Sequence, residues 1–285
     1  MRRGEGNEKV ISCPLHKWTW HNDGTMIGAP HFEENPCMHL RSWPTTDWRG
    51  LLFAGKRNVL EDLKGVGFEH EMSFENYRYH HTEYHECHQN WKSFMEVYGD
   101  DYHVAPAHPG LGKMVSLKNL QVLTGENWHM QIVESIENTE LKTTPIYDAW
   151  RKKCLEQGDG KLPHYGAIWF AYYPNIMVEV YPYTITVSTL HPISPTETLN
   201  VIEFFYHTDV SEELIKAEME AYMETAIEDD DLAERMDAGR KILHEQAHIW
   251  ADDGVLSPED YAGPYHEPME IGVKHFHEWY EKNMS

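Results

Sequence analysis

A block of β-rich segments followed by one long helical segment is the feature that most constrains the fold of this 285-residue chain. Residues 164–173, 176–188 and 198–206 are rich in β-branched and aromatic residues, and Pro-Asn and Pro-Thr turns separate them. They predict at least three strands. A helical pattern then runs from Ser211, a suitable N-cap with two glutamates after it, to about Ala247. Strands followed by a long helix predict an α+β fold.

The rest of the chain predicts a smaller unit before this block. Residues 10–55 alternate short strands and turns, a β unit of about 50 residues that is too small to hold much core unaided. A charged, helix-compatible stretch follows at 57–64, residues 85–104 have helical character, and a short helix is expected at 273–280. We therefore predict two domains, residues 1–55 and residues 56–285.

Composition excludes several classes of partner. The chain has 47 acidic and 24 basic residues, so it lacks the basic surface that nucleic acid or an anionic membrane would need. No apolar run approaches the roughly 20 residues of a spanning helix, and the N-terminus has no apolar signal segment. Four scattered cysteines do not form a disulfide framework, which favours a cytoplasmic protein.

A pair of histidines, His103 and His108, is the strongest chemical signal. Because the chain has 20 histidines, their spacing alone carries little weight, and the context matters more. His103 is expected to close a helical turn with Asp100 three residues earlier on the same face, where the Asp100 carboxylate can hydrogen-bond the imidazole. Pro106 is expected to break the helix, so that His108 approaches from another direction. Two imidazoles and one carboxylate form the ligand set of non-haem Fe(II) oxygenases.

Asp229 is the candidate for the third ligand. On a helical wheel its neighbours are Tyr222, Thr225, Ala226, Leu232, Ala233 and Met236, whereas Glu228, Asp230 and Asp231 point elsewhere. A carboxylate that faces the core is costly unless it is paired or bound to a metal. A buried ion pair or a frayed helix is the alternative, and the two histidines favour the metal.

Four motifs, in this order and spacing, resemble the alpha subunit of Rieske non-haem iron aromatic ring-hydroxylating oxygenases over roughly residues 5–280. They are Cys13-Pro14-Leu15-His16-Lys17-Trp18, Asn90-Trp91-Lys92 followed by Glu96, Gly99 to His108, and Glu228-Asp229 followed by Leu232 and Glu234. The resemblance implies that His103, His108 and Asp229 ligate a mononuclear Fe(II), and that Asp100 links this iron to the Rieske cluster of a neighbouring subunit. Val97 and Asp237 depart from the usual residues, but neither is a ligand.

The same resemblance implies a fold and a function. The larger domain would have a helix-grip fold, in which a curved antiparallel sheet and a long C-terminal helix enclose a cavity. The enzyme would use O₂ and NAD(P)H to hydroxylate an aromatic or other small organic substrate, as a monooxygenase or dioxygenase, for example in aromatic hydrocarbon catabolism. A ferredoxin or flavin reductase would supply electrons to a homotrimer, with a beta subunit as a possible companion.

Cys13 and His16 match the second ligand pair of a Rieske [2Fe–2S] cluster, which needs two cysteines and two histidines. The twelve residues before Cys13 contain no cysteine or histidine to match the first pair. We therefore expect that the chain starts at an internal methionine of a longer protein. On that expectation the mononuclear iron site forms, the cluster is not assembled here, and turnover with a reductase is absent or poor.

Two alternatives remain open. Cys13, His16, Cys37 and His39 could hold a structural zinc, although the surroundings of Cys37 favour a packed thiol. A helix-grip fold could also bind an apolar ligand without any catalysis. The strand aromatics could line a substrate cavity, although a plain hydrophobic core is expected for more than half of them, because strand alternation turns about half of the side chains to one face. These aromatics are Trp169, Phe170, Tyr172, Tyr173, Tyr181 and Tyr183.

Overall fold

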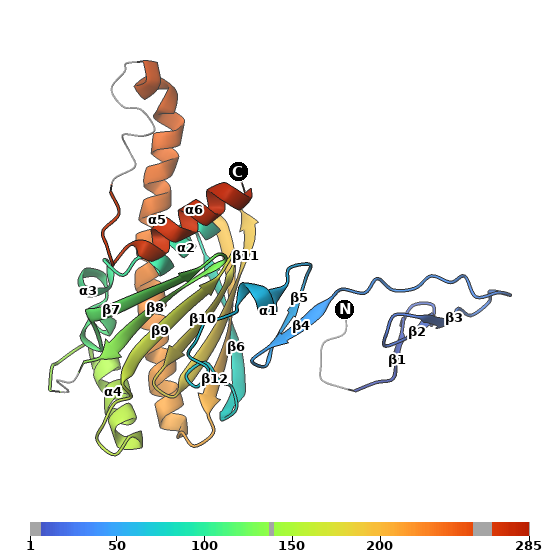
Figure 1. Ribbon diagram of the computed structural model, residues 1–285, viewed down its shortest axis with the longest axis horizontal. Coiled ribbons are helices and arrows are strands. Elements are labelled where there is room, and N and C mark those ends of the chain that lie inside the picture. Colours follow the sequence, from blue (N-terminus) through green and yellow to red (C-terminus); the bar gives the residue numbers. More distant parts are fainter. Residues whose placement is uncertain (1–6, 137–139, 253–263, 285) are drawn as a thin grey trace. The chain divides into compact units, whose positions relative to one another are not determined.

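Two units make up the structure, a computed structural model that describes residues 7–136, 140–252 and 264–284 (Figure 1). The first unit ends at Glu61 and the second begins at Asp62. None of the described helices combines the length and the apolar character needed to cross a membrane.

The N-terminal unit consists of short strands, as its sequence predicts. Strands β1 (Val10–Ser12), β2 (Thr19–His21) and β3 (Met26–Gly28) form a three-stranded antiparallel sheet, and β4 (Thr45–Trp48) pairs with β5 (Leu51–Ala54). The loop with Cys13 and His16 connects β1 to β2, whose end residues Ser12 and Thr19 are paired. A short helix, α1 (Val59–Asp62), follows.

A seven-stranded antiparallel sheet forms the centre of the larger unit, in the order β6-β12-β11-β10-β9-β8-β7. Its strands are β6 (Tyr77–Cys87), β7 (Val115–Gly125), β8 (Trp128–Ser135), β9 (Tyr165–Tyr172), β10 (Ile176–Tyr181), β11 (Thr184–Ser194) and β12 (Glu197–His207). This sheet and the long helix confirm the predicted α+β class.

Helix α5 (Glu212–Asp252) runs along one face of this sheet (Figure 1). It begins where predicted, because the Ser211 hydroxyl accepts a hydrogen bond from the Leu214 N–H at 3.3 Å. Its first turns pack Leu214 and Ile215 against Phe204 and Tyr206 of β12. Helix α4 (Pro145–Gln157) packs beside α5, so the floor below the sheet is made of two helices.

Three shorter helices lie at one end of the sheet. Helix α2 (Trp91–Gly99) starts at its N-cap Asn90, and α3 (Val104–Ala107) and the 3₁₀ helix η1 (Leu111–Lys113) follow. The terminal helix α6 (Ile271–Met284) packs on α2 and on the sheet through Phe276 and Trp279. The docked terminal helix predicted around residues 273–280 is present and longer than predicted.

Two local predictions were wrong. Residues 85–87 belong to strand β6 rather than to a helix, because Cys87 pairs with Thr198 of β12 and this pairing overrides local propensity. Pro106 does not break the helix after His103 but lies within the single turn of α3, where its missing N–H has no helical partner to lose. The predicted minimum of three strands in the β-rich block is met by four, because Tyr183, with a φ of 67°, forms a turn that divides residues 176–188 into two strands.

The backbones of α2 and α6 touch where two glycines face each other. A Cβ on Gly272 would lie 2.6 Å from the Gly99 carbonyl oxygen and 3.1 Å from the Gly99 Cα. These two atoms belong to the backbone of α2, and Cδ2 of the fully buried His129 side chain also lies 3.1 Å away, so the neighbours have little room to move aside.

We expect Gly272→Ala to lower the free energy of unfolding by about 1–3 kcal/mol, because the added methyl group overpacks this crossing. Gly239→Ala is the matched control, since a Cβ at Gly239 on α5 meets nothing within 4 Å. That change should be neutral or stabilising by up to about 1 kcal/mol, owing to the better helix propensity of alanine. Urea denaturation measures the free energy of unfolding of each variant. Equal changes in Gly272→Ala and Gly239→Ala would contradict the close approach of α2 and α6.

Candidate metal centre and adjoining cavity

His103, His108 and Asp229 converge although 126 residues separate the first from the last. His103 caps the start of α3, His108 follows its end, and Asp229 lies on α5. The Nε2 atoms of the two histidines are 3.1 Å apart. Asp229 Oδ1 lies 3.2 Å from the His103 Nε2 and 3.0 Å from the His108 Nε2.

A second carboxylate binds the outer nitrogen of each histidine. His103 Nδ1 lies 3.2 Å from Asp100 Oδ2, the contact that the sequence predicts, and His108 Nδ1 lies 2.7 Å from Glu228 Oε2. Nδ1–H groups that donate to these carboxylates leave both Nε2 lone pairs directed at a common point. This arrangement is the usual one for metal-bound imidazoles.

The contact of Glu228 corrects the prediction that this side chain points away from the site. A helical wheel gives only the direction of the Cα–Cβ bond, and a glutamate side chain is long enough to reach round the helix. Asp229 also differs slightly from expectation. Its side chain is 33% exposed rather than buried, because it borders an open cavity.

The charges of the cluster favour a cation at its centre. Burial lowers the pKa of His103, but hydrogen bonds to Asp100 and Asp229 and their charges outweigh burial and raise this pKa to about 10. The pKa of His108 is also raised, since Asp229 and Glu228 outweigh the effect of burial. Burial opposes ionisation of Asp229, yet the two histidines lower its pKa. The site therefore stabilises positive charge, whether a proton or a metal ion.

The donor set fits a six-coordinate metal ion. Adjacent ligands of an octahedral ion that binds at about 2.1 Å stand about 3 Å apart. The three ligand atoms here are separated by 3.1, 3.2 and 3.0 Å, which corresponds to one face of such an octahedron. Two histidines and one carboxylate on one face form the ligand set of non-haem Fe(II) oxygenases, in which the remaining positions are open.

Among the residues that the structure describes, one other set of possible metal ligands converges, namely His85, Cys87 and Asp230. Here His85 Nε2 already contacts Asp230 Oδ2 at 2.7 Å. Burial, with the charge of Asp230, raises the pKa of Cys87 to about 12, so this thiol stays protonated at neutral pH. The set is accordingly an ion pair beside a buried thiol.

Cys13 and His16 occupy the loop between β1 and β2. The backbone N–H groups of His16 and Leu15 lower the pKa of Cys13, so the loop favours a thiolate. Cys37 is exposed rather than packed, because Asn35 accepts from the Cys37 N–H in a turn where Cys37 has a φ of 53°. His39 Nδ1 accepts from the Met26 N–H at 3.0 Å. Across the described ranges, these four residues do not converge as the zinc alternative requires.

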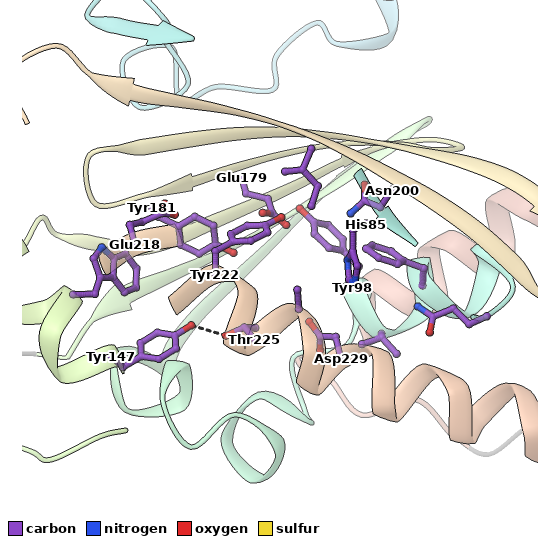
Figure 2. A pocket seen from close by; sticks show the side chains of 16 residues that line it. His85, Tyr98, Tyr147, Glu179, Tyr181, Asn200, Glu218, Tyr222, Thr225 and Asp229 are labelled. Atoms are coloured by element: carbon purple, nitrogen blue, oxygen red, sulfur yellow. Dashed lines mark hydrogen bonds between the residues drawn. The ribbon is translucent and has the colours of Figure 1, made fainter. Parts of the chain in front are cut away.

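A cavity lies between the sheet and α5, and Asp229 is among the side chains that line it (Figure 2). A second, smaller pocket contains His103 and His108. The two share lining residues, which are Val97, Tyr98, Glu179, Tyr181, Thr225 and Asp229. A molecule in the cavity would therefore lie beside the candidate metal ligands.

The cavity wall was only partly predictable. Of the six strand aromatics singled out, Tyr181 lines the cavity and Trp169 lines the metal pocket, whereas Phe170, Tyr172 and Tyr173 are buried. Tyr222 lines the cavity from α5, seven residues before Asp229, where the helical wheel already placed it on the same face. Tyr98 of α2 carried no signal in the sequence.

Comparisons with known proteins agree on one family. Residues 74–285 match the family described as Ring hydroxylating alpha subunit (catalytic domain). The chain is 46% identical over its whole length to putrescine 2-hydroxylase of Ralstonia nicotianae, and covers 76% of that protein. It is 42% identical over 96% of its length to putrescine 2-hydroxylase of Bordetella bronchiseptica, and covers 62% of that protein. It therefore spans less than the full length of these relatives.

A solved structure shows the same fold at low sequence identity. It is a quaternary ammonium Rieske monooxygenase described in connection with carnitine oxidation by gut microbiota and electron transfer between subunits. The similarity has a TM-score of 0.69 at 19% identity and covers 97% of this chain and 73% of that chain.

Removal of the Asp229 carboxylate and removal of the Glu228 carboxylate should have different effects on metal binding. Asp229→Ala should abolish stoichiometric Fe(II) binding, because it removes a proposed ligand. Glu228→Gln should weaken Fe(II) binding about 10–100-fold, because it loosens the orientation of His108. Asp231→Asn, an exposed acid two residues further along α5, is the control and should bind Fe(II) as the unmodified chain does. Anaerobic equilibrium dialysis measures all three, and unchanged binding by Asp229→Ala would contradict the assignment.

Glu218, a buried acid of the cavity, should make the fold less stable at alkaline pH. Burial raises its pKa from 4.5 to about 8, so the folded state holds this proton more tightly than the unfolded state. The protonated form of Glu218 predominates below about pH 4.5 in both states. As the pH rises from there towards 8, the carboxyl ionises in the unfolded state but not in the folded state, so the free energy of unfolding falls. Between the two pKa values, each pH unit lowers the free energy of unfolding by about 1.4 kcal/mol.

Glu218→Gln should therefore lose less stability than the unmodified chain between pH 5 and pH 8.5. The quantity to compare is the free energy of unfolding by urea at several pH values. Glu220→Gln is the control, since Glu220 is an exposed acid on the same helix and its replacement removes one carboxylate without changing the cavity. Parallel curves for Glu218→Gln and the unmodified chain would contradict the buried, uncompensated carboxylate.

Proposed function

This chain belongs to the ring-hydroxylating alpha subunit family, and we propose that it is the O₂-activating component of a monooxygenase that hydroxylates an aliphatic amine. The observation that supports this best is the convergence of His103, His108 and Asp229 beside a large cavity, within the residues that match the family. The non-catalytic alternative gives no role to this converging ligand set.

His103, His108 and Asp229 would hold the metal as a facial triad. When bound there, Fe(II) supplies the activation of O₂ that no protein side chain can provide. The side chains of this chain orient and protect the site. Asp100 and Glu228 hold the Nδ1 protons of the two histidines and so keep both imidazoles in the tautomer that can bind the metal through Nε2.

The cavity would bind the substrate next to this site and limit the access of water. Tyr98, Tyr181 and Thr225 line both the cavity and the metal pocket, so they would contact the part of the substrate that reacts. Exclusion of bulk water prevents side reactions of activated oxygen.

The relatives favour an amine over the aromatic ring expected from the family resemblance. Two relatives above 40% identity are putrescine 2-hydroxylases, and the structurally similar monooxygenase acts on quaternary ammonium compounds. These compounds are cations. A chain with 47 acidic and 24 basic residues is suited to attract cationic molecules.

Electrons would reach the iron from a Rieske cluster. Cys13 and His16 would supply two of its four protein ligands, and the two others have no counterpart among residues 1–12. Asp100 contacts His103 and is 26% exposed, so it is placed to connect the iron site to a cluster on a neighbouring subunit. A homotrimer with a ferredoxin or flavin reductase as electron donor would complete such a system.

We expect the chain to bind about one Fe(II) after anaerobic reconstitution, and an amine to alter that iron. Nitric oxide, as a substitute for O₂, should give the paramagnetic signal of a ferrous nitrosyl centre. Putrescine should change this signal, because it would occupy the cavity beside the open positions, whereas naphthalene should not. The measurement is electron paramagnetic resonance, with His103→Ala as the variant that lacks the centre. Absence of iron, or a response to naphthalene alone, would overturn the proposal.

A further inference from the structure

Two of the residues that line the cavity are buried glutamates. Glu179 of β10 is 7% exposed and Glu218 of α5 is 1% exposed. None of the residues that line the cavity or the metal pocket is a lysine or an arginine. Two carboxylates thus face a cavity whose lining contains no lysine or arginine to pair with them.

The partners of both glutamates that the structure shows are neutral hydroxyl groups. Thr186 donates to Glu179 Oε2 at 2.8 Å, and Tyr206 donates to Glu218 Oε2 at 2.6 Å. Burial raises the pKa of Glu179 to about 7 and that of Glu218 to about 8. A cation in the cavity would reverse this penalty, because it would favour the ionised form of each acid.

Two further side chains in the same wall point to a donor-rich ligand. The amide oxygens Gln89 Oε1 and Asn200 Oδ1 are buried and have no hydrogen-bond partner, although the two residues are only 1% and 3% exposed. The indole N–H of Trp150 is the corresponding unpartnered donor. Buried acceptors without partners are costly, and an ammonium group, which has three donors and no acceptor, satisfies them.

The two glutamates lie at different distances from the metal centre. Glu179 lines both the cavity and the metal pocket, whereas Glu218 lines the cavity alone. Glu218, Tyr222, Thr225 and Asp229 follow one face of α5, and the eleven residues from Glu218 to Asp229 span about 16 Å along the helix. Figure 2 shows Glu218 and Asp229 at opposite sides of Tyr222. Glu179 is therefore the proximal carboxylate and Glu218 the distal one.

From this arrangement we infer that the cavity is a receptor for an unbranched aliphatic diamine, in which Glu179 binds the ammonium group nearer the metal and Glu218 binds the other. The inference rests on the proposed function for its choice of an amine. The rings of Tyr98, Tyr181 and Tyr222 lie along the same cavity, where they pack against the alkyl chain and offer their faces to the cationic ends.

Calorimetric titration of the full chain tests the inference with three ligands that share a four-carbon chain. 1,4-Diaminobutane should bind at least about tenfold more tightly than 1-butylamine, because it engages a second charge-assisted contact, and 1,4-butanediol should not bind measurably. Glu179→Gln should weaken both amines about tenfold or more. Glu218→Gln should lower the affinity for the diamine to that for the monoamine and leave the monoamine unchanged. Glu220→Gln, on the exposed side of α5, is the control.

Binding of the diol as tightly as the diamine, or equal loss of both amines in Glu218→Gln, would overturn the inference. Circular dichroism checks that the variants fold, and the ranking of the three ligands by the unmodified chain decides the question even if one variant does not. The titrations are made on the metal-free and on the Fe(II)-loaded chain. If the chain prefers the diamine but does not bind iron, the proposed function alone is rejected. If it binds iron but does not prefer the diamine, the inferred diamine site alone is rejected.

Discussion

The contact of Asp229 with His103 and His108 is the interaction on which the rest of the site depends. It joins α5 to the segment around α3 and brings three ligand atoms within 3.2 Å of one another. The same helix forms the cavity floor, since Tyr222 and Thr225 precede Asp229 on one face. Leu214 and Ile215 pack the start of α5 against the sheet. Asp229, the proposed metal ligand, and the cavity floor are therefore parts of the same helix, and a tilt of α5 would move both.

Three consecutive acids of α5 contact four different histidine nitrogen atoms. Glu228 contacts the outer nitrogen of His108, Asp229 contacts the inner nitrogens of the metal site, and Asp230 contacts His85 of β6. Successive residues of a helix diverge by about 100°, so such a run spreads its carboxylates around the helix instead of concentrating them at one point. Asp229 therefore lies between Glu228 and Asp230, and each of these two acids contacts a histidine.

The sequence allowed the prediction of features with a local or periodic signal. The long helix, the β-rich block, the contact of Asp100 with His103 and the inward direction of Asp229 all follow from spacing along one element. Strand β6 was missed, because it depends on pairing with β12, which is more than 100 residues away. Glu179 and Glu218 were missed as well, since a single acid in an apolar strand or on a helix gives no sign of the cavity it faces. The iron-ligand role of the triad remains a prediction.

Burial of Glu179 and Glu218 has no structural benefit that the fold explains. Both accept hydrogen bonds from hydroxyl groups, yet burial raises the pKa of both acids, and the proximity of Glu179 and Asp229 adds like-charge repulsion. Glutamine would keep the hydroxyl contacts without this cost. Two carboxylates in an enclosed space are stabilised when two positive charges enter it, and this balance is what a diamine provides. The part of the cavity that is least favourable for folding is thus the part that is best explained by a ligand.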